Sequence, residues 1–338
     1  MNRKHILMAC AGLAVAGMAV AGGVAASLLL SCVEGTTDEA DTPKYIYIDA
    51  DDTTDSLRLK SNLGWRFDAY ARAMKPVVRT GRYRVDPGMR RLELYRRMRN
   101  GQQEPLMLRL PSVRTLDRLA SLLGRELMMD SATVMQSFVD STFCREYDYT
   151  PATLYALFIP NTYEIYWNIS LPAFMQRMKQ ENERFWTEER EQRAASLGLT
   201  HLEVSTLASI VDEETANNAE KPMIAGLYLN RLAKGMLLQA DPTVKFAQGD
   251  WSLRRIYFSH LGIDNPYNTY IYKGLPPGPI RVPSVEGLDA VLYRKEHPFL
   301  YMCAKEDFSG THNFAVSYAE HLRNARRYSK ALNERNIK

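Results

Sequence analysis

Apolar residues divide the chain into an unbroken apolar run near the N-terminus and a longer body of mixed apolar and polar residues. The run covers residues 6–30 and carries no charge over 25 positions. At about 1.5 Å of rise per residue, a helix of this length crosses a hydrocarbon core of about 30 Å. The pattern therefore predicts one membrane-spanning helix, followed by about 300 residues of folded protein.

The charges that flank this run predict its orientation. Arg3 and Lys4 precede it, and the next basic residue after it is Lys44, beyond four acidic side chains. Since basic residues stay on the cytoplasmic side, residues 1–5 are expected in the cytoplasm and the body outside it, tethered to the cell (inner) membrane. A cleaved signal peptide is the first alternative, although its apolar region usually spans only about 7 to 15 residues. A lipoprotein is the second, because residues 29–32 (LLSC) resemble a lipobox, with an ill-fitting leucine beside the serine.

The first part of the body, residues 44–103, mixes short strand and helix patterns. Residues 45–48 alternate in polarity as a strand does, and residues 55–74 have a helical period. Residues 80–89 indicate a strand followed by a Pro-Gly turn, and a helix beginning at residue 92 stops at Asn100-Gly101. These patterns predict a small α+β module.

The second part, residues 104–338, continues the mixture, so the predicted fold class is α+β throughout. Strands are expected at 106–110, within the aromatic segment 158–167, and at 300–302, where the strand should be buried. Helical periods cover residues 112–127, 171–197, 201–215 and 219–234.

Composition narrows the class of protein without defining it. The body is rich enough in apolar residues to form a core, at 46% hydrophobic for the chain, and the formal charge of +4 is modest. The basic residues at 90–99 are read as a solvated helix face, and nucleic acid is not an expected partner. Cys144 and Cys303 could pair in an oxidising compartment but match no metal-ligand spacing, and the six histidines form no zinc motif. We expect neither a metal nor another cofactor.

Three consecutive acids, Asp212, Glu213 and Glu214, stand near the end of the helix predicted at 201–215. Successive helical positions differ by about 100°, so the three side chains point in different directions. Glu214 follows Ile210 by four residues and joins the inward side, Glu213 is expected to be solvated, and Asp212 lies roughly opposite Glu214. The helix dipole disfavours acids at this end, which invites a functional explanation. Burial and neighbouring negative charge would give a carboxyl the raised pKa of a general acid.

Loops rich in Pro, Gly, Asn and Tyr follow this cluster. They contain the segment QADPT at residues 239–243, YNTY at 267–270 and GLPPGPI at 274–280. Tyrosine offers an apolar face for a sugar ring together with a hydroxyl, and asparagine offers both a donor and an acceptor. Gln239 and Asp241 are candidate sugar contacts because the Asp-Pro-Thr turn orients side chains rigidly. An acid followed by such loops indicates a carbohydrate-processing site.

Taken in order, these segments resemble the endolytic murein transglycosylase (YceG-like) family. IVDEET at residues 210–215 is similar to the family's Ile-Val-Glu-Lys-Glu-Thr, with Asp212 and Glu213 replacing its first Glu and its Lys. FIPNTY at 158–163 resembles Phe-Pro-Asp-Thr-Tyr, with Asn161 in place of Asp. Asn230-Arg231 and THNF at 311–314, followed by His321, match further blocks, with Leu322 where the family commonly has Asn. The YNTY and GLPPGPI segments match without change.

The resemblance implies a role for each candidate residue. Glu214 corresponds to the family's catalytic acid. The implied substrate-binding residues are Gln239, Asp241, Tyr267, Asn268, Thr269 and Tyr270. The implied supporting residues are Asp212, Glu220, Asn230, Arg231 and His312. Residues 44–103 correspond to a LysM-like module, for which glycan binding is a family expectation and a spacer is the alternative, and residues 104–338 to the catalytic domain.

The implied reaction is non-hydrolytic cleavage of the β-1,4 bond between N-acetylmuramic acid and N-acetylglucosamine within a peptidoglycan strand. Glu214 would protonate the glycosidic oxygen and then deprotonate the C6 hydroxyl, which closes on C1 as a 1,6-anhydro end. Such an enzyme would limit nascent strand length during wall synthesis, with peptidoglycan synthases as candidate partners. A water-using hydrolase, with Asp212, Glu220 or Asp241 as second carboxylate, and a non-catalytic glycan-binding scaffold are the alternatives.

Overall fold

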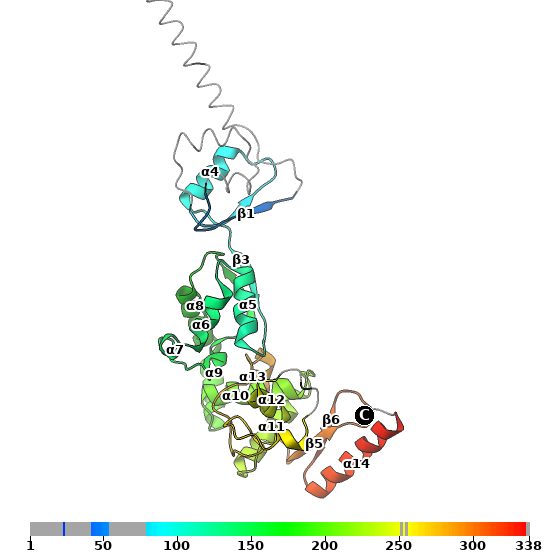
Figure 1. The fold of residues 1–338 in the computed structure, drawn as a ribbon. Helices are drawn as coiled ribbons and strands as arrows, with labels where there is room; N and C mark the ends of the chain where they lie inside the picture. The colour runs from blue at the N-terminus through cyan, green and yellow to red at the C-terminus, as the bar shows by residue number, and fades with distance from the viewer. Residues whose placement is uncertain (1–22, 24–41, 54–78, 251–252, 254–255, 336–338) are drawn as a thin grey trace, which may run out of the picture. The chain divides into compact units, whose positions relative to one another are not determined.

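The computed structural model describes residues 23, 42–53, 79–250, 253 and 256–335 (Figure 1). The predicted membrane span at 6–30, apart from Gly23, and the helix expected at 55–74 lie outside these residues. Among the described helices, none is by itself long and apolar enough to cross a membrane. Two consecutive ones, Glu188–Ser196 and His201–Glu214, meet the length and composition criteria only as a pair bent by 80°.

The chain divides into two compact units. Unit 1 comprises Met1–Met107 and Glu164–Ile169, and unit 2 comprises Leu108–Tyr163 and Ser170–Lys338. Within unit 1, the returning segment is held by Asn168, whose Nδ2 donates to the Thr80 carbonyl at 3.0 Å. The sequence analysis placed residues 164–169 in the second part of the chain, residues 104–338. Periodicity gave no sign that this segment belongs to unit 1.

Unit 1 is built on an antiparallel strand pair and one helix. Strand β1 (Lys44–Ile48) pairs with β2 (Gly81–Val85), and helix α4 (Arg91–Asn100) follows. Inward residues of the strands and apolar residues of the helix form one core, which contains Ile46, Ile48, Tyr83, Val85, Met89, Leu94, Tyr95 and Met98. The helix ends where Gly101 adopts a left-handed conformation (φ 68°), so the strands, the helix and its stop are confirmed.

The first half of unit 2 is a group of short elements. Strands β3 (Leu106–Leu110) and β4 (Asn161–Ile165) pair with each other, and the division between the units passes through both of them. The helices between them are α5 (Leu116–Glu126), α6 (Ser131–Val139), α7 (Ser141–Arg145) and the 3₁₀ turn η1 (Leu154–Leu157). Helix α5 is shorter than the predicted 112–127 because Thr115 caps its N-terminus.

The single helix expected at 171–197 is wrong, since two helices occupy the segment: α8 (Leu171–Phe185) and α9 (Glu188–Ser196). The chain leaves the helical conformation at Trp186, and Thr187 caps α9 by accepting a hydrogen bond from the Arg190 N–H. Phe185 and Trp186 are both buried in the main core of unit 2. In a straight helix, two adjacent side chains point about 100° apart. The break in the helix therefore lets both Phe185 and Trp186 enter the core.

The centre of unit 2 is a helical core around α10 (His201–Glu214). Helices α11 (Lys221–Ala233) and α13 (Val285–Leu292) pack against it, and α12 (Asp241–Gln248) lies alongside. A capping box between Thr200 and Glu203 fixes the start of α10, and every residue from 204 to 212 is buried. A helix buried on all sides is rigid, so its C-terminal residue is held firmly by the core.

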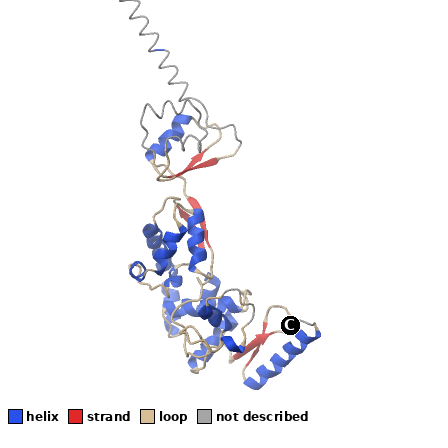
Figure 2. Ribbon diagram, viewed as in Figure 1, coloured by secondary structure: helices blue, strands red, loops and turns tan. Residues whose placement is uncertain are grey.

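The C-terminal part of unit 2 carries a hairpin and a long helix. Strands β5 (Tyr301–Ala304) and β6 (His312–Ala315) pair antiparallel, with Ala304 opposite His312, and α14 (Tyr318–Glu334) packs on both. Figure 2 shows this strand pair beside α14. The short 3₁₀ turn η2 (Phe258–His260) lies earlier in unit 2. The predicted strand at 300–302 is present, but β5 is only partly buried. Cys144 and Cys303 are both free thiols.

Candidate active site

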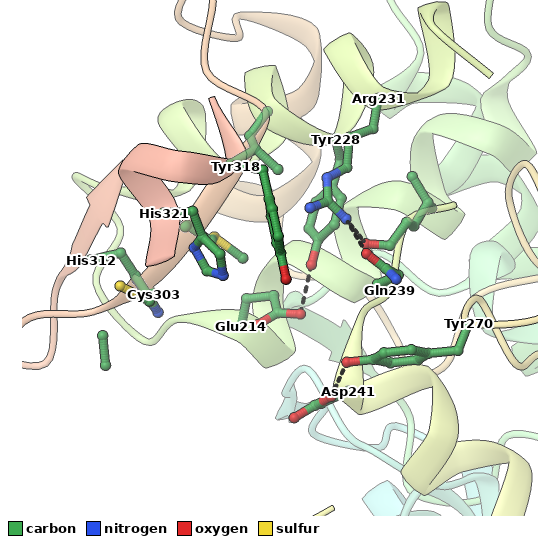
Figure 3. Close-up of a pocket in the computed structure, with 14 residues that line it drawn as sticks. Glu214, Tyr228, Arg231, Gln239, Asp241, Tyr270, Cys303, His312, Tyr318 and His321 are labelled. Atoms are coloured by element: carbon green, nitrogen blue, oxygen red, sulfur yellow. Dashed lines mark hydrogen bonds between the residues drawn. The ribbon is translucent and has the colours of Figure 1, made fainter. Parts of the chain in front are cut away.

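A cavity of about 470 Å³ opens at the C-terminal end of α10 (Figure 3). Its walls come from α10, α11, the loop before α12, the YNTY loop, the β5–β6 hairpin and α14. Its polar lining consists of Glu214, Tyr228, Arg231, Gln239, Asp241, Tyr270, Cys303, His312, Tyr318 and His321. All of these elements belong to unit 2.

Glu214 is the last residue of α10, and its side chain points into this cavity (Figure 3). The chain leaves the helix at once, because Thr215 is extended (φ −147°, ψ 138°). The hydroxyl of Tyr228, on α11, donates a hydrogen bond of 2.7 Å to Oε1 of Glu214. Tyr228 is only 2% exposed, so a firmly packed ring fixes one carboxyl oxygen and leaves Oε2 for other contacts.

The surroundings of Glu214 favour its protonated form. Burial raises the pKa of Glu214 from its ordinary value of 4.5 to about 7, and the nearby charges of Asp241 and Glu213 act in the same direction. The Tyr228 hydrogen bond and His312 partly oppose them. A carboxyl group with a pKa near neutrality can both donate and accept a proton at physiological pH.

Asp241 and Tyr270 form a second hydrogen-bonded pair on the cavity wall. The Tyr270 hydroxyl donates to Oδ1 of Asp241 at 2.6 Å. Burial, followed by the contact with Asp241, raises the pKa of Tyr270, so its hydroxyl remains a donor. Asp241 is the first residue of α12 and is exposed to solvent, which leaves Oδ2 available to a ligand.

Gln239 reaches the cavity through an uncommon backbone conformation. Its φ of 53° lies in the left-handed region that residues other than glycine seldom adopt. The conformation is held because the Gln239 N–H donates to the Thr269 carbonyl at 3.1 Å. Such a conformation persists only where its surroundings enforce it, and it often marks a functional position. Gln239, Asp241 and Tyr270 are thus the three predicted sugar contacts that the structure brings to the cavity.

The other three predicted sugar contacts do not line the cavity. Asn268 is completely buried, and its Nδ2 donates to the carbonyls of Leu261 and Ile263, both at 2.9 Å. Thr269 is also buried and accepts a hydrogen bond from the Ala240 N–H at 3.0 Å.

Tyr267, the third of these residues, packs on Phe246 with ring centroids 4.5 Å apart, and its hydroxyl donates to the Ala152 carbonyl at 3.3 Å. The expectation that Tyr267, Asn268 and Thr269 touch sugar is therefore not supported by their positions. They stabilise the loop that presents Tyr270.

Asp212 is a structural anchor rather than a second acid in the cavity. Its side chain is buried and forms an ion pair of 2.7 Å with Lys221. It also accepts hydrogen bonds from the Ser284 N–H at 2.6 Å and the Ser284 hydroxyl at 2.7 Å. A Cβ at Gly287 would lie 2.7 Å from the carboxylate, so only glycine fits beside it. The carboxylate thereby joins α10 to the start of α13.

The expectation that Glu213 is solvated is wrong. Its side chain is only 8% exposed, and Oε1 pairs with Arg114 Nε at 2.8 Å and Arg281 Nη1 at 2.7 Å. These arginines lie 99 and 68 residues away in the sequence, so helical periodicity could not reveal them. The two arginines stabilise the Glu213 carboxylate on a helix face that the sequence pattern predicted to be exposed to solvent.

Glu220 orients His312. Oε1 of Glu220 accepts the His312 N–H at 2.7 Å, and Oε2 lies 2.8 Å from His312 Nδ1. With both oxygens engaged, the Glu220 carboxylate has no role as a second acid in the cavity. Because Nδ1 contacts Glu220, Nε2 is the ring nitrogen left to face the cavity that Glu214 lines.

Asn230 and Arg231 tie α11 to its neighbours through backbone carbonyls. Asn230 Nδ2 donates to the carbonyls of His297 at 2.6 Å and Phe299 at 3.1 Å. Arg231 donates to Leu300 at 2.6 Å and Leu238 at 2.8 Å, and contacts Gln239 Oε1 at 3.4 Å. Both residues thus support the walls of the cavity.

Tyr228, Tyr318 and His321 line the cavity although the sequence did not single them out as site residues. Tyr318 and His321 are three residues apart in α14, a spacing that places them on one helix face. That spacing, together with the family block that His321 closes, is the signal that the sequence offered. Burial lowers the pKa of His321, and its Nδ1 is buried without a partner among the described residues.

No group of three or more His, Cys, Asp or Glu side chains within the described residues could hold a metal ion. The cavity combines one carboxylic acid with a pKa near neutrality, a second acid (Asp241), Arg231 and several neutral hydrogen-bonding and aromatic side chains. An α+β protein with such a cavity belongs to the class of proteins equipped for general acid–base chemistry on a polar ligand.

Comparison with known proteins gives the family. The sequence model of the YceG-like family matches residues 50–327, so the chain belongs to the YceG-like family. It is similar to endolytic murein transglycosylases of Bacillus subtilis (38% identical over 130 residues) and Streptococcus pneumoniae (34% over 133 residues). Each match covers 38% of this chain but only 35% and 24% of these relatives' own lengths.

A solved structure shares the fold. The 2.6 Å crystal structure of a protein of Listeria monocytogenes described as YceG-like superposes with a TM-score of 0.57 and 25% sequence identity. The superposition covers 84% of this chain and 99% of the other. The mixed α+β fold class predicted from the sequence is therefore confirmed at the level of the family.

Proposed function

We propose that the protein is an endolytic peptidoglycan lytic transglycosylase in which Glu214 is the catalytic acid and base. The proposal rests on which carboxyl groups near the cavity are engaged in structural contacts and which one is free to transfer a proton. Asp212 and Glu220 are fully engaged in structural contacts, whereas Glu214 has a raised pKa and a free oxygen. The names of the relatives in B. subtilis and S. pneumoniae support the reaction and the murein substrate.

The proposed mechanism needs one protein carboxyl group. Protonated Glu214 donates its proton to the glycosidic oxygen as the bond from that oxygen to C1 of N-acetylmuramic acid breaks. The C6 hydroxyl of the same sugar attacks C1, and its proton passes to the Glu214 carboxylate. The proton count is thereby restored, no water is consumed, and the new end is a 1,6-anhydro sugar. Because the nucleophile belongs to the substrate, a paired carboxylate is not required.

A water-using hydrolase is the second candidate, and one observation favours it. Asp241 lines the same cavity as Glu214 and keeps one oxygen available, so it could act as the base that activates water. The products differ: hydrolysis leaves reducing ends, whereas the proposed reaction leaves anhydro ends. A scaffold without activity would leave strands uncut.

We propose that residues 44–103 form the LysM-like module that the sequence resemblance implies. The arrangement of β1, β2 and α4 around one core is compatible with such a module. The chain carrying Glu214→Gln should sediment with insoluble peptidoglycan, and a version lacking residues 44–103 should bind less. Equal binding by the two would leave the segment as a spacer.

The proposed location is the outer side of the cell membrane, with the chain anchored by residues 6–30. The uncharged run and the preceding Arg3 and Lys4 support this topology. Protease added to spheroplasts should remove the body, while the intact protein should pellet with membranes. A lipid-modified Cys32, or release of a soluble mature form, would contradict an uncleaved anchor.

From this location the enzyme would limit the length of nascent strands beside the wall-synthesis enzymes. Cells whose only copy carries Glu214→Gln should therefore contain longer glycan strands than wild-type cells, measured by size separation of strands freed from their peptides. Crosslinking in wild-type cells should recover peptidoglycan synthases. An unchanged length distribution would contradict this role.

A further inference from the structure

A second cavity of about 360 Å³ adjoins the first, and the two share Glu214 and Asp241. It is also lined by Arg114, Glu213, Pro242, Lys245 and Ile256. The candidate catalytic acid therefore stands between two arms of one site. A strand that is cut within its length must extend to both sides of the acid, so both arms are open to it.

The two arms differ in charge. Among the described lysines and arginines, Arg231 alone lines the first arm, and four backbone or side-chain oxygens accept its hydrogen bonds. Apart from Arg231 and the shared acids Glu214 and Asp241, that arm presents donors and acceptors such as Gln239 and Tyr318. In the second arm two basic side chains, Arg114 and Lys245, face the ligand space.

The cations around the second arm outnumber its ionised acids. Within the part of the chain that the structure describes, no carboxylate pairs with Lys245, and Arg114 uses only Nε, on Glu213. Glu213 is also paired with Arg281 at 2.7 Å. With Glu214 protonated, the described cations Arg114, Arg281 and Lys245 face two ionised carboxylates, those of Glu213 and Asp241. The second arm therefore carries net positive charge beside the cutting point.

Resting on the proposed function, we propose that Lys245 and Arg114 bind a carboxylate carried by the muramic acid substituent of the strand. The sugar rings are uncharged and offer these two cations only neutral hydrogen-bond acceptors, whereas a carboxylate forms the stronger, charge-assisted hydrogen bonds with them. The strand's carboxylates lie on the stem peptide or, once an amidase has removed the peptide, on the exposed lactyl group. The enzyme would thus discriminate strands by the charge of this substituent, in addition to recognising the sugars.

Three strand preparations test the proposal with the full-length protein. The first carries stem peptides, the second is denuded and exposes lactyl carboxylates, and the third is denuded with those carboxylates converted to methylamides. For Lys245→Met, kcat/KM on carboxylate-bearing strands relative to methylamide strands should fall about fivefold, the scale of one partly exposed ion pair. Lys245→Arg should restore the ratio. Lys234→Met, at an exposed lysine outside both cavities, should leave it unchanged.

The outcomes separate the inference from the function on which it rests. A reduced ratio on peptide-bearing strands assigns the carboxylate to the stem peptide, and a reduced ratio on denuded strands assigns it to the lactyl group. Raising the salt concentration should weaken the wild-type preference and have less effect on Lys245→Met. An unchanged ratio in Lys245→Met overturns the inference alone. Failure of the wild type to cut any of the three strands overturns the proposed function, and the inference with it.

Discussion

The hydroxyl of Tyr228 donates a 2.7 Å hydrogen bond to Oε1 of Glu214, joining the end of α10 to the middle of α11. This bond opposes the burial that raises the pKa of Glu214, so the value of about 7 is a balance between the two effects. Burial and Glu214 both raise the pKa of Tyr228, so its hydroxyl remains protonated and continues to donate. Tyr228 is therefore a positioning residue for the catalytic group.

Tyr228→Phe should move the pH profile of cleavage. Loss of a hydrogen bond to the charged form raises the pKa of Glu214 further, and the reaction needs Glu214 protonated. The basic limb of kcat/KM should therefore shift upward by about one pH unit, the scale of one charge-assisted hydrogen bond. Tyr293→Phe, which removes a surface hydroxyl that donates to Glu189, is the matched control. A basic limb that stays in place would show that Tyr228 acts only in packing.

Glu214→Gln should reduce cleavage by about 10²- to 10⁴-fold, because the amide has no proton to transfer. The same variant should gain stability over the wild type as the pH rises. The pKa of Glu214 is higher in the folded chain, so the folded state retains a proton that the unfolded state loses between about pH 4.5 and 7. Wild-type stability therefore falls through this window, whereas the variant is unaffected.

The quantity to compare is the free energy of unfolding of Glu214→Gln minus that of the wild type. This difference should be larger at pH 8 than at pH 4 by about 1 to 3 kcal/mol. Thermal or denaturant unfolding across this pH range measures it. Glu296→Gln, at a surface acid 86% exposed, should show no such trend. A constant difference between variant and wild type from pH 4 to 8 would argue against a raised pKa.

Glu213→Gln should be destabilising, contrary to the solvated role that the sequence indicated. The change leaves Arg114 and Arg281 facing each other without their shared carboxylate, at a cost of about 1 to 3 kcal/mol. Loss of the Glu213 charge should also lower the pKa of Glu214 and shift the basic limb downward. Urea unfolding and a pH profile measure the two effects. Unfolding free energy equal to that of the wild type would refute the pairing.

Substitutions in the YNTY loop should affect either stability or activity, depending on the residue that is changed. Asn268→Ala leaves two partly buried carbonyl oxygens without a donor and should lower the free energy of unfolding by about 1 to 3 kcal/mol. Tyr270→Phe removes the donor to Asp241 on the cavity wall and should reduce kcat/KM by about tenfold with little change in stability. Paired melting and cleavage assays measure both variants. The reverse pattern would mean that Asn268, rather than Tyr270, meets the substrate.

Local pattern was sufficient for α10 and α11, two of the helices that hold the site, and the spacing from Ile210 to Glu214 placed Glu214 inward. In unit 1, the end of α4 followed from Gly101. The Asp-Pro-Thr turn was wrong, since Asp241 begins helix α12, and α14 was not predicted. Tertiary contacts decided the rest. The Tyr228–Glu214 contact arises where two helices pack, and neither helix reveals it alone.

Polar loop residues were the hardest to assign. Asn268 and Thr269 have the composition of a ligand-binding loop, yet their side chains bond to backbone groups of neighbouring segments, at Leu261 and Ala240. The same residue types serve both purposes, so sequence could not distinguish them. The raised pKa of Glu214, in contrast, depends on burial that only the folded chain supplies.

Mass analysis of strands cut by the purified protein distinguishes transglycosylation from hydrolysis. Purified glycan strands are incubated with the wild type and with Glu214→Gln, and the new ends are identified by mass. We expect ends of the 1,6-anhydro form, lighter by one water than reducing ends, from the wild type, and no new ends from the variant. New ends that are exclusively reducing would contradict the transglycosylase reaction and favour hydrolysis with Asp241.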